Sequence, residues 1–315
     1  TSILFQTGFP SSNVSGGLPK AGGGRQLVQD TGTGGSWPVS TDRVVWAVGA
    51  ESVLDRLTGS ARADFAAKAK AALANTLATD RAVAWDAVDG LYRGEESFLD
   101  WREQSYPSWA KFDLVAIANA KALSTNVLFW HAHRLLARLA KESGDATLAK
   151  THSQHAIALG KAILKRFTVP GTPLLAALVG GPFDPSPTQR FELLGNALAV
   201  RLGLVTGKDA LALLSAWPMS DAGPPVQWPQ QPGAAIYHNR ALWPFVTAWH
   251  AMAAAQAGHA EAVTRSLRSL TEFAALNLSH MENLEFLTGK NFVADGPLSG
   301  PVVNSRRQLW SVAGF

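Results

Sequence analysis

The chain has 315 residues, of which 47% are hydrophobic and 17% charged, with a formal net charge of +4 and no cysteine. The lack of cysteine excludes a disulfide framework, a thiolate nucleophile and a thiolate metal site. Lysine and arginine form no clustered stripe of the kind that binds nucleic acid, and no apolar run reaches the roughly 18 residues of a membrane span. We therefore expect a soluble protein, cytoplasmic or exported, with no nucleic-acid or membrane partner.

Residues 1–41 form a loop-rich segment, in which glycine, proline, serine and threonine are frequent. The triplet Gly22-Gly-Gly24 lacks the Gly-Lys-Ser/Thr ending of a phosphate loop. We expect this segment to line or cover a pocket, with a disordered arm as the alternative. The chain begins without methionine and ends in an apolar stretch, which predicts that it is the core of a longer polypeptide or a trimmed one.

Apolar residues at three- and four-residue spacing predict helices over most of the remaining chain. Gly144 and Gly258, each between two predicted helices, favour antiparallel helical hairpins. Strand patterns are rare, so the fold class is all-α, and we expect residues 42–315 to form one helical domain. We place Ser60 as an N-cap and a helix break at Ser124-Thr-Asn126. The predicted helices cover residues 42–57, 60–80, 112–142, 145–167, 187–203, 207–215, 239–257, 260–278 and the stretch from about 304.

A short segment at residues 93–104 concentrates charge in a chain that otherwise has little of it. Its sequence is RGEESFLDWREQ. The spacing Arg93-x-x-Glu96-Ser97-x-x-Asp100 resembles the general-acid segment of inverting six-hairpin glycosidases. This group includes trehalases, processing α-glucosidases and glycogen-debranching enzymes. A salt-bridged carboxylate at a helix start is the alternative for Asp100.

A second segment, ENLEFLTG at residues 282–289, is similar to the general-base segment of the same group. The step from Glu282 to Thr288 matches the family pattern, which favours Glu282 as the base. The chain departs from that pattern at residues 284–286, where related sequences often have an aromatic residue and Asn or Asp before proline. Glu285 therefore stays open as the alternative base.

The resemblance implies an (α/α)6 toroid in which Asp100 is the general acid and Glu282 the general base. In an inverting glycosidase the two carboxyl groups stand roughly 6.5–9.5 Å apart, because a water molecule must fit beside the sugar. A full ring has about twelve helices and the periodicity predicts about nine, so the ring is expected to be incomplete here or completed by other residues. No 34- to 47-residue repeat supports a solenoid.

Three further segments resemble parts of the family that lead polar and aromatic residues to the pocket: those near residue 42, at 227–245 and from 304. Tryptophan is also abundant, with 11 Trp against 3 Tyr, and its broad ring suits the apolar faces of sugars. The alternatives are helix caps, at Asn239 for example, and core aromatics. We expect the substrate to be bound by Arg93, Glu96, Trp101, Arg102, Trp46, Trp228, Tyr237, His238, Asn239, Arg240, Trp243 and Trp310.

The histidines do not predict a metal site. His131 and His133 lie two residues apart on a predicted helix and so face different directions. His152 and His155 share a face, but without a supporting carboxylate we expect a hydrogen-bonded or exposed pair. Neither a metal nor another cofactor is expected.

The predicted function is hydrolysis of terminal α-glycosidic, glucoside-like bonds with inversion, on an oligosaccharide or glycoside substrate. The alternative is a catalytically silent helical toroid that binds a glycan or a protein partner. The oligomeric state stays open.

Overall fold

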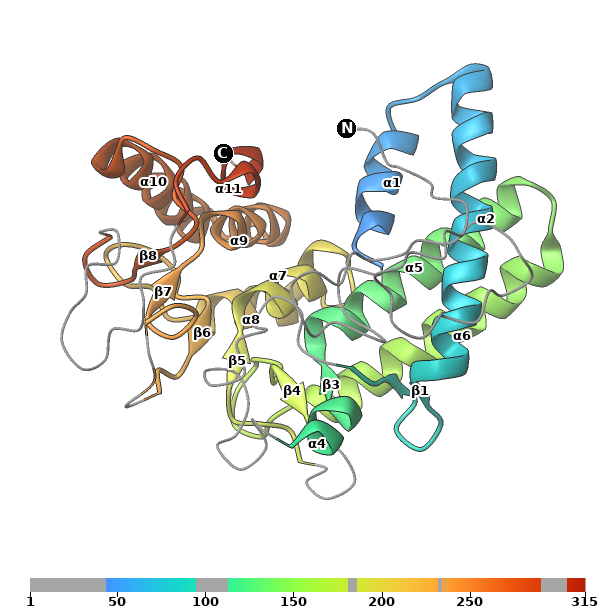
Figure 1. The fold of residues 1–315 in the computed structure, drawn as a ribbon, viewed down its shortest axis with the longest axis horizontal. Coiled ribbons are helices and arrows are strands. Elements are labelled where there is room, and N and C mark those ends of the chain that lie inside the picture. Colours follow the sequence, from blue (N-terminus) through green and yellow to red (C-terminus); the bar gives the residue numbers. More distant parts are fainter. Residues whose placement is uncertain are drawn as a thin grey trace. The chain divides into compact units, whose positions relative to one another are not determined.

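The computed structural model describes residues 44–94, 113–180, 186–231, 234, 236–289 and 305–314. Helices dominate these residues, and the strands are two residues long (Figure 1), which confirms the all-α class. In the described part of the chain, no helix is both long and apolar enough to cross a membrane. The predictions that fall outside the described ranges concern residues 1–41, the first two residues of the segment near residue 42, Glu96, Asp100, Trp101 and Arg102.

The described residues divide into two compact units. Unit 1 contains residues 44–94 and 115–166, with residue 180, and unit 2 contains the remainder. That residues 42–315 form a single domain stays a prediction. In chain order, the elements up to residue 167 are α1 (Trp46–Leu54), α2 (Gly59–Ala84), β1 (Trp85–Asp86), β2 (Leu91–Tyr92), α4 (Leu114–Asn119), β3 (Lys121–Ala122), α5 (Leu123–Glu142) and α6 (Ala146–Phe167).

The elements that follow belong to unit 2, in which α9 is the central helix. Helix α9 contacts α7, α8, α10 and α11, and α9 and α10 form an antiparallel hairpin (Figure 1). Gly258 closes α9 with φ of 76°, in the left-handed region that glycine adopts without steric cost. The elements are β4 (Leu178–Val179), β5 (Phe191–Glu192), α7 (Leu193–Arg201), α8 (Gly207–Ala216), β6 (Gln227–Trp228), β7 (Ala241–Leu242), α9 (Pro244–Ala257), α10 (Ala260–Asn277), β8 (Leu284–Glu285) and α11 (Leu309–Gly314).

In unit 1, helix α5 is the central element and packs against α1 and α2. A buried ion-pair network lies at its start. Lys121 is 1% exposed and its ammonium lies 3.0 Å from Asp86 and 2.7 Å from Asp89. Arg166 lies 3.0 Å from Asp89. Because a buried charge is costly unless it is paired, this network fixes the β1–β2 hairpin against β3 and α6.

Each unit holds an extended segment against the start of a buried helix through one asparagine. In unit 1, Asn126 accepts a bond from the backbone N–H of Tyr92 at 2.8 Å and donates to its carbonyl at 3.0 Å. In unit 2, Asn196 does the same with Leu175, at 2.9 and 3.0 Å. Each amide also donates to the carbonyl four residues earlier. The two sites therefore have the same local design, although they lie far apart in the sequence.

Several helix boundaries differ from the predictions, and contacts or capping positions explain three of these differences. The break in 112–142 lies at residues 120–122, because Asn126 bonds within helix α5 instead of ending a helix. Helix α2 begins at Gly59 with Thr58 in the N-cap position, so the Ser60 cap is wrong. The predicted helix 187–203 begins at residue 193, because Phe191 and Glu192 pair with Trp228 and Gln227 as strands.

Candidate functional site

Glu282 lies in unit 2, where two donors among the described residues hold its carboxylate. The hydroxyl of Tyr237 donates to Oε1 at 3.3 Å, and the backbone N–H of Ser305 donates to Oε2 at 3.0 Å. The Glu282 N–H in turn donates to the Ser305 carbonyl at 2.9 Å. The residue is 7% exposed. Both carboxylate oxygens therefore act as acceptors, in an orientation fixed by the chain at residue 305.

Glu285, the alternative base, has a different environment. Its Oε2 accepts bonds from the N–H of Leu287 at 3.1 Å, and from both the N–H and the hydroxyl of Thr288 at 2.8 and 2.9 Å. Its Oε1 accepts from Arg240 at 3.2 Å. With these donors on one carboxylate, Glu285 closes the turn that follows β8. Within the described part of the chain, the Glu282 carboxylate accepts fewer hydrogen bonds than the Glu285 carboxylate.

Strands β7 and β8 bring these segments together, since Ala241 pairs with Glu285 and Leu242 with Leu284. The turn ends at Gly289, which has φ of +63°, in the left-handed region. A Cβ atom at this position would collide with the ring of Phe273, so there is no room for a side chain. The glycine that ends the 282–289 motif is thus needed to form this turn beside Glu282.

An aromatic cluster supports Tyr237. The ring of Trp243 meets the Tyr237 ring edge-on at 5.0 Å, and its indole N–H donates to the Tyr237 carbonyl at 3.0 Å. The ring of His238 lies 4.7 Å from Tyr237 and 5.1 Å from Trp243. Burial lowers the pKa of His238 to about 3, so its ring is neutral at physiological pH. Trp243 is only 3% exposed. The cluster therefore fixes the position of the Tyr237 hydroxyl.

Among the described residues of unit 2, two tryptophans are exposed: Trp228 at 37% and Trp310 at 48%. Trp310 stacks on Phe245 at 5.1 Å with its plane 9° from parallel, and meets Trp243 edge-on at 6.5 Å. An exposed indole of this kind offers a flat apolar surface to a ligand. Trp310 is thus linked to the Tyr237 cluster through Trp243.

Asn239 and Arg240 shape the loop before β7. The side chain of Asn239 accepts from the N–H of Gln231 at 2.8 Å and donates to the carbonyls of Gln231 and Ala234 at 3.1 and 3.2 Å. Asn239 does not cap a helix, because α9 begins at Pro244. Arg240 has φ of 58°, in the left-handed region. Its guanidinium lies on Glu285, so the structure places this predicted sugar ligand in a structural ion pair.

The remaining predicted ligands, Arg93 and Trp46, belong to unit 1. Trp46 is the first residue of α1 and is partly buried. The Nε of Arg93 lies 3.3 Å from Asp86. Burial tends to raise the pKa of Asp86, but Lys121 and Arg93 outweigh it and lower that pKa. Arg93 thus belongs to the edge of the buried ion-pair network around Lys121.

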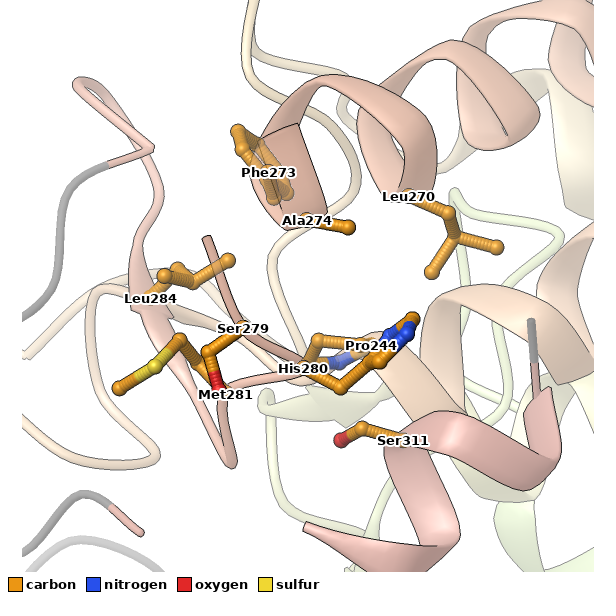
Figure 2. Close-up of a pocket in the computed structure, with 9 residues that line it drawn as sticks. All are labelled: Pro244, Leu270, Phe273, Ala274, Ser279, His280, Met281, Leu284 and Ser311. Carbon is orange, nitrogen blue, oxygen red and sulfur yellow. The ribbon is translucent and has the colours of Figure 1, made fainter. Parts of the chain in front are cut away.

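A small pocket in unit 2 lies next to the Glu282 segment (Figure 2). Its volume is about 10 Å³, close to that of one water position. It is lined mainly by apolar side chains, among them Leu270, Phe273 and Leu284, with Ser311 at its margin. It is too small for a sugar ring and is a packing gap behind the segment that carries Glu282.

Sequence reasoning identified Glu282, Tyr237 and Trp243 as members of one region, and the structure brings these three together in unit 2. It did not identify Ser305, which contacts the Glu282 carboxylate through its backbone. Backbone contacts leave no signal in residue type. The resemblance to a glycosidase motif also could not show that the Glu285 carboxylate accepts more hydrogen bonds than the Glu282 carboxylate.

Comparison with solved structures shows which fold the chain has. It is similar to a GH78 family rhamnosidase of Bacillus sp. GL1, with 16% identity over 88% of this chain and a TM-score of 0.62. A GH63 mannosylglycerate hydrolase from Thermus thermophilus, in complex with glucose, is 15% identical over 85% of this chain with a TM-score of 0.62. Neutral trehalase Nth1 from Saccharomyces cerevisiae is 14% identical over 74% of this chain with a TM-score of 0.55.

These neighbours are (α/α)6 glycosidase folds, and the chain shares that fold, as the sequence predicted. The chain spans 26% of the rhamnosidase, 56% of the trehalase and 73% of the mannosylglycerate hydrolase. No family model and no curated protein matches the sequence.

Proposed function

We propose that the chain is a glycoside hydrolase that cleaves terminal α-glycosidic, glucoside-like bonds with inversion of configuration. The observation that carries the proposal is the Glu282 carboxylate, which Tyr237 and the Ser305 N–H hold in a fixed orientation. The fold supports it, because glycoside hydrolases are among the structures that share this fold.

In the proposed reaction, Glu282 takes a proton from a water molecule as that water attacks the anomeric carbon. Asp100, outside the described residues, gives a proton to the leaving glycosidic oxygen as the C–O bond breaks. The water oxygen enters on the face opposite the leaving group, so an α-linkage yields a β-configured product. With one hydrogen bond on each oxygen, the Glu282 carboxylate keeps acceptor capacity for the attacking water, as the base role requires.

Substrate binding is proposed to use polar and aromatic residues of unit 2, which also carries Glu282. The Tyr237 hydroxyl is within reach of the Glu282 carboxylate, and Trp228 and Trp310 offer exposed indole surfaces. The segment near Asp100 completes the proposed set with Arg93, Arg102, Glu96 and Trp101. The two arginines are suited to sugar hydroxyls, because a guanidinium fork presents several donors.

The experiment is a screen of aryl α- and β-glycosides and disaccharides with the purified protein, followed by NMR of the anomer released first. We expect release of a monosaccharide from α-linked substrates, initially as the β-anomer. A first product with the α-configuration would contradict the inverting mechanism.

Asp100→Asn serves as the acid variant and Glu282→Gln as the base variant. Each should lower turnover by at least ~10²-fold, because an amide cannot transfer the proton. If no glycoside is hydrolysed while glycans still bind the wild type, the chain is the catalytically silent toroid instead. That outcome would be visible by calorimetry with the same sugars.

A further inference from the structure

Three histidines from two helices meet in unit 1. His133 lies on α5, while His152 and His155 lie three residues apart on α6 and so share a face. The ring centroid of His133 lies 5.0 Å from that of His152 and 5.3 Å from that of His155, and the α6 pair lies 5.5 Å apart. One nitrogen from each ring lies within 4.8 Å of the other two. From the sequence, we compared His133 only with His131, and His152 only with His155, since spacing along one helix does not show that the two helices meet.

The nitrogens that face one another are only partly satisfied by hydrogen bonds. Nδ1 of His133 and Nδ1 of His152 are 2.8 Å apart and share one proton between them. Nδ1 of His155 is buried and has no hydrogen-bond partner among the described residues. A buried polar atom without a partner is unfavourable unless something else binds it. The cluster therefore has a ring nitrogen that is available to a ligand.

The outer face of His133 is fixed in the way that metal-binding histidines usually are. Its Nε2 lies 3.0 Å from the hydroxyl of Tyr92. Tyr92 is itself fully buried, stacked on Phe129 at 3.8 Å and bonded through its backbone to Asn126. A hydrogen bond at one ring nitrogen orients the other toward a metal and fixes the tautomer. Here that other nitrogen, Nδ1, points to His152.

The rings are neutral, which is the form that binds metals. Burial lowers the pKa of all three, and the charge of Arg81 lowers it further, for His152 to about 4. The positive charge of Arg81 works against a bound cation. The buried carboxylate of Asp80 raises the pKa of Tyr92, whereas Arg81 lowers it. The positive charge of Arg81 is therefore partly balanced by the negative charge of Asp80.

We propose that His133, His152 and His155 bind one divalent transition-metal ion, of which zinc fits best, and that the ion clamps α5 to α6. Three imidazole nitrogens without thiolate or carboxylate are a donor set that suits zinc, copper and nickel. Zinc–nitrogen bonds of about 2.0–2.1 Å place tetrahedral ligands ~3.3 Å apart. The ring nitrogens, now within 4.8 Å of one another, reach that spacing by rotation about side-chain bonds. The fourth position is left for water.

The test is a zinc titration of the metal-stripped full chain against a competing chelator, together with the absorption spectrum of the cobalt-substituted protein. We expect one zinc per chain and a tetrahedral cobalt spectrum. His155→Gln and His152→Gln should each raise the zinc Kd by at least ~10-fold and abolish that spectrum. Tyr92→Phe, which removes the hydroxyl contacts with His133 and Arg81, should raise the Kd by about tenfold.

His259→Gln is the matched control, because His259 lies at the start of α10 in unit 2, on a different helix from the cluster. Its zinc affinity and cobalt spectrum should equal those of the wild type. Thermal unfolding gives a second readout: zinc should raise the Tm of the wild type and of His259→Gln, but not that of His155→Gln. The proposal is overturned if the wild type binds no stoichiometric zinc, or if His155→Gln binds it as tightly as His259→Gln.

Discussion

At the scale of single residues, the two glutamates near residue 282 differ by their partners. Within the described residues, Glu282 accepts two hydrogen bonds, one of them from a side chain, whereas Glu285 accepts four. A base must be able to bind a substrate water with at least one oxygen. Glu285 has less capacity for that, because its Oε2 already accepts three hydrogen bonds and its Oε1 is paired with Arg240, whereas each oxygen of Glu282 accepts one.

This difference predicts opposite phenotypes for two isosteric variants. Glu282→Gln should lower kcat by at least ~10²-fold with little change in Tm, since it removes the proposed proton acceptor but keeps the shape. Glu285→Gln should keep most of the turnover and lose about 1–3 kcal/mol of stability, since one charged hydrogen-bond partner becomes neutral. Steady-state kinetics and chemical denaturation distinguish them. Full activity in Glu282→Gln would move the base to Glu285.

Tyr237 is the residue whose hydroxyl reaches Glu282. In Tyr237→Phe the aromatic contacts with Trp243 and His238 remain, and the 3.3 Å bond to the carboxylate is lost. We expect kcat/KM to fall by about tenfold and the Tm to fall by only a few degrees, because one hydrogen bond to a charged group is worth roughly 1.5–3 kcal/mol. Unchanged kinetics would show that Tyr237 does not position the carboxylate during the reaction.

At the scale of elements, two asparagines join an extended segment to a helix in the same manner. Asn196 is fully buried and bonds to the backbone of Leu175 and Glu192. Asn196→Ala would leave those backbone groups without these bonds at the start of α7. We expect a loss of roughly 2–4 kcal/mol, measured by urea denaturation, from several hydrogen bonds at about 1 kcal/mol each plus the desolvation penalty. Asn126→Ala, its counterpart in unit 1, should behave alike, and a loss below about 1 kcal/mol in both would contradict this role.

The periodicity of apolar residues predicted where most helices lie, but it predicted neither the strands nor the exact ends of the helices. Apolar spacing located α6, α8 and α10 closely, because each has one buried face. It placed the start of α7 too early, at residue 187 instead of 193, since Phe191 fits the apolar pattern of the helix, whereas Phe191 and Glu192 pair with β6. Two-residue strands are too short to leave a period, so only tertiary structure shows them.

The candidate site was predictable in part for the same physical reason. The resemblance of short segments to a known family named Glu282, Tyr237 and Trp243 as candidate site residues, because residue type and spacing are visible in the sequence. Residue type and spacing do not show which distant segments of the chain contact one another. Neither the Ser305 bond to Glu282 nor the meeting of three histidines from α5 and α6 can be read from spacing along one helix.

At the scale of the whole molecule, buried histidines make stability depend on pH. Burial lowers the pKa of His250 to about 4 from 6.5, and the Ser266 hydroxyl lies 2.9 Å from its Nδ1. Because the folded-state pKa lies below the unfolded one, the unfolded chain binds an extra proton between these values. The stabilisation is complete above the unfolded pKa and is lost as the pH falls toward the folded one. His238, with a pKa of about 3, adds to the same trend.

We therefore expect the free energy of unfolding to fall by about 3 kcal/mol per such histidine between roughly pH 6.5 and 4. The measurement is urea denaturation at several pH values for the wild type, His250→Gln and Ser266→Ala. His250→Gln should have a shallower slope with pH, because one titrating group is gone. Ser266→Ala should be less stable at every pH but keep more of the slope, since the buried imidazole remains. Identical slopes in the wild type and His250→Gln would show that this ring titrates alike in the folded and unfolded chain.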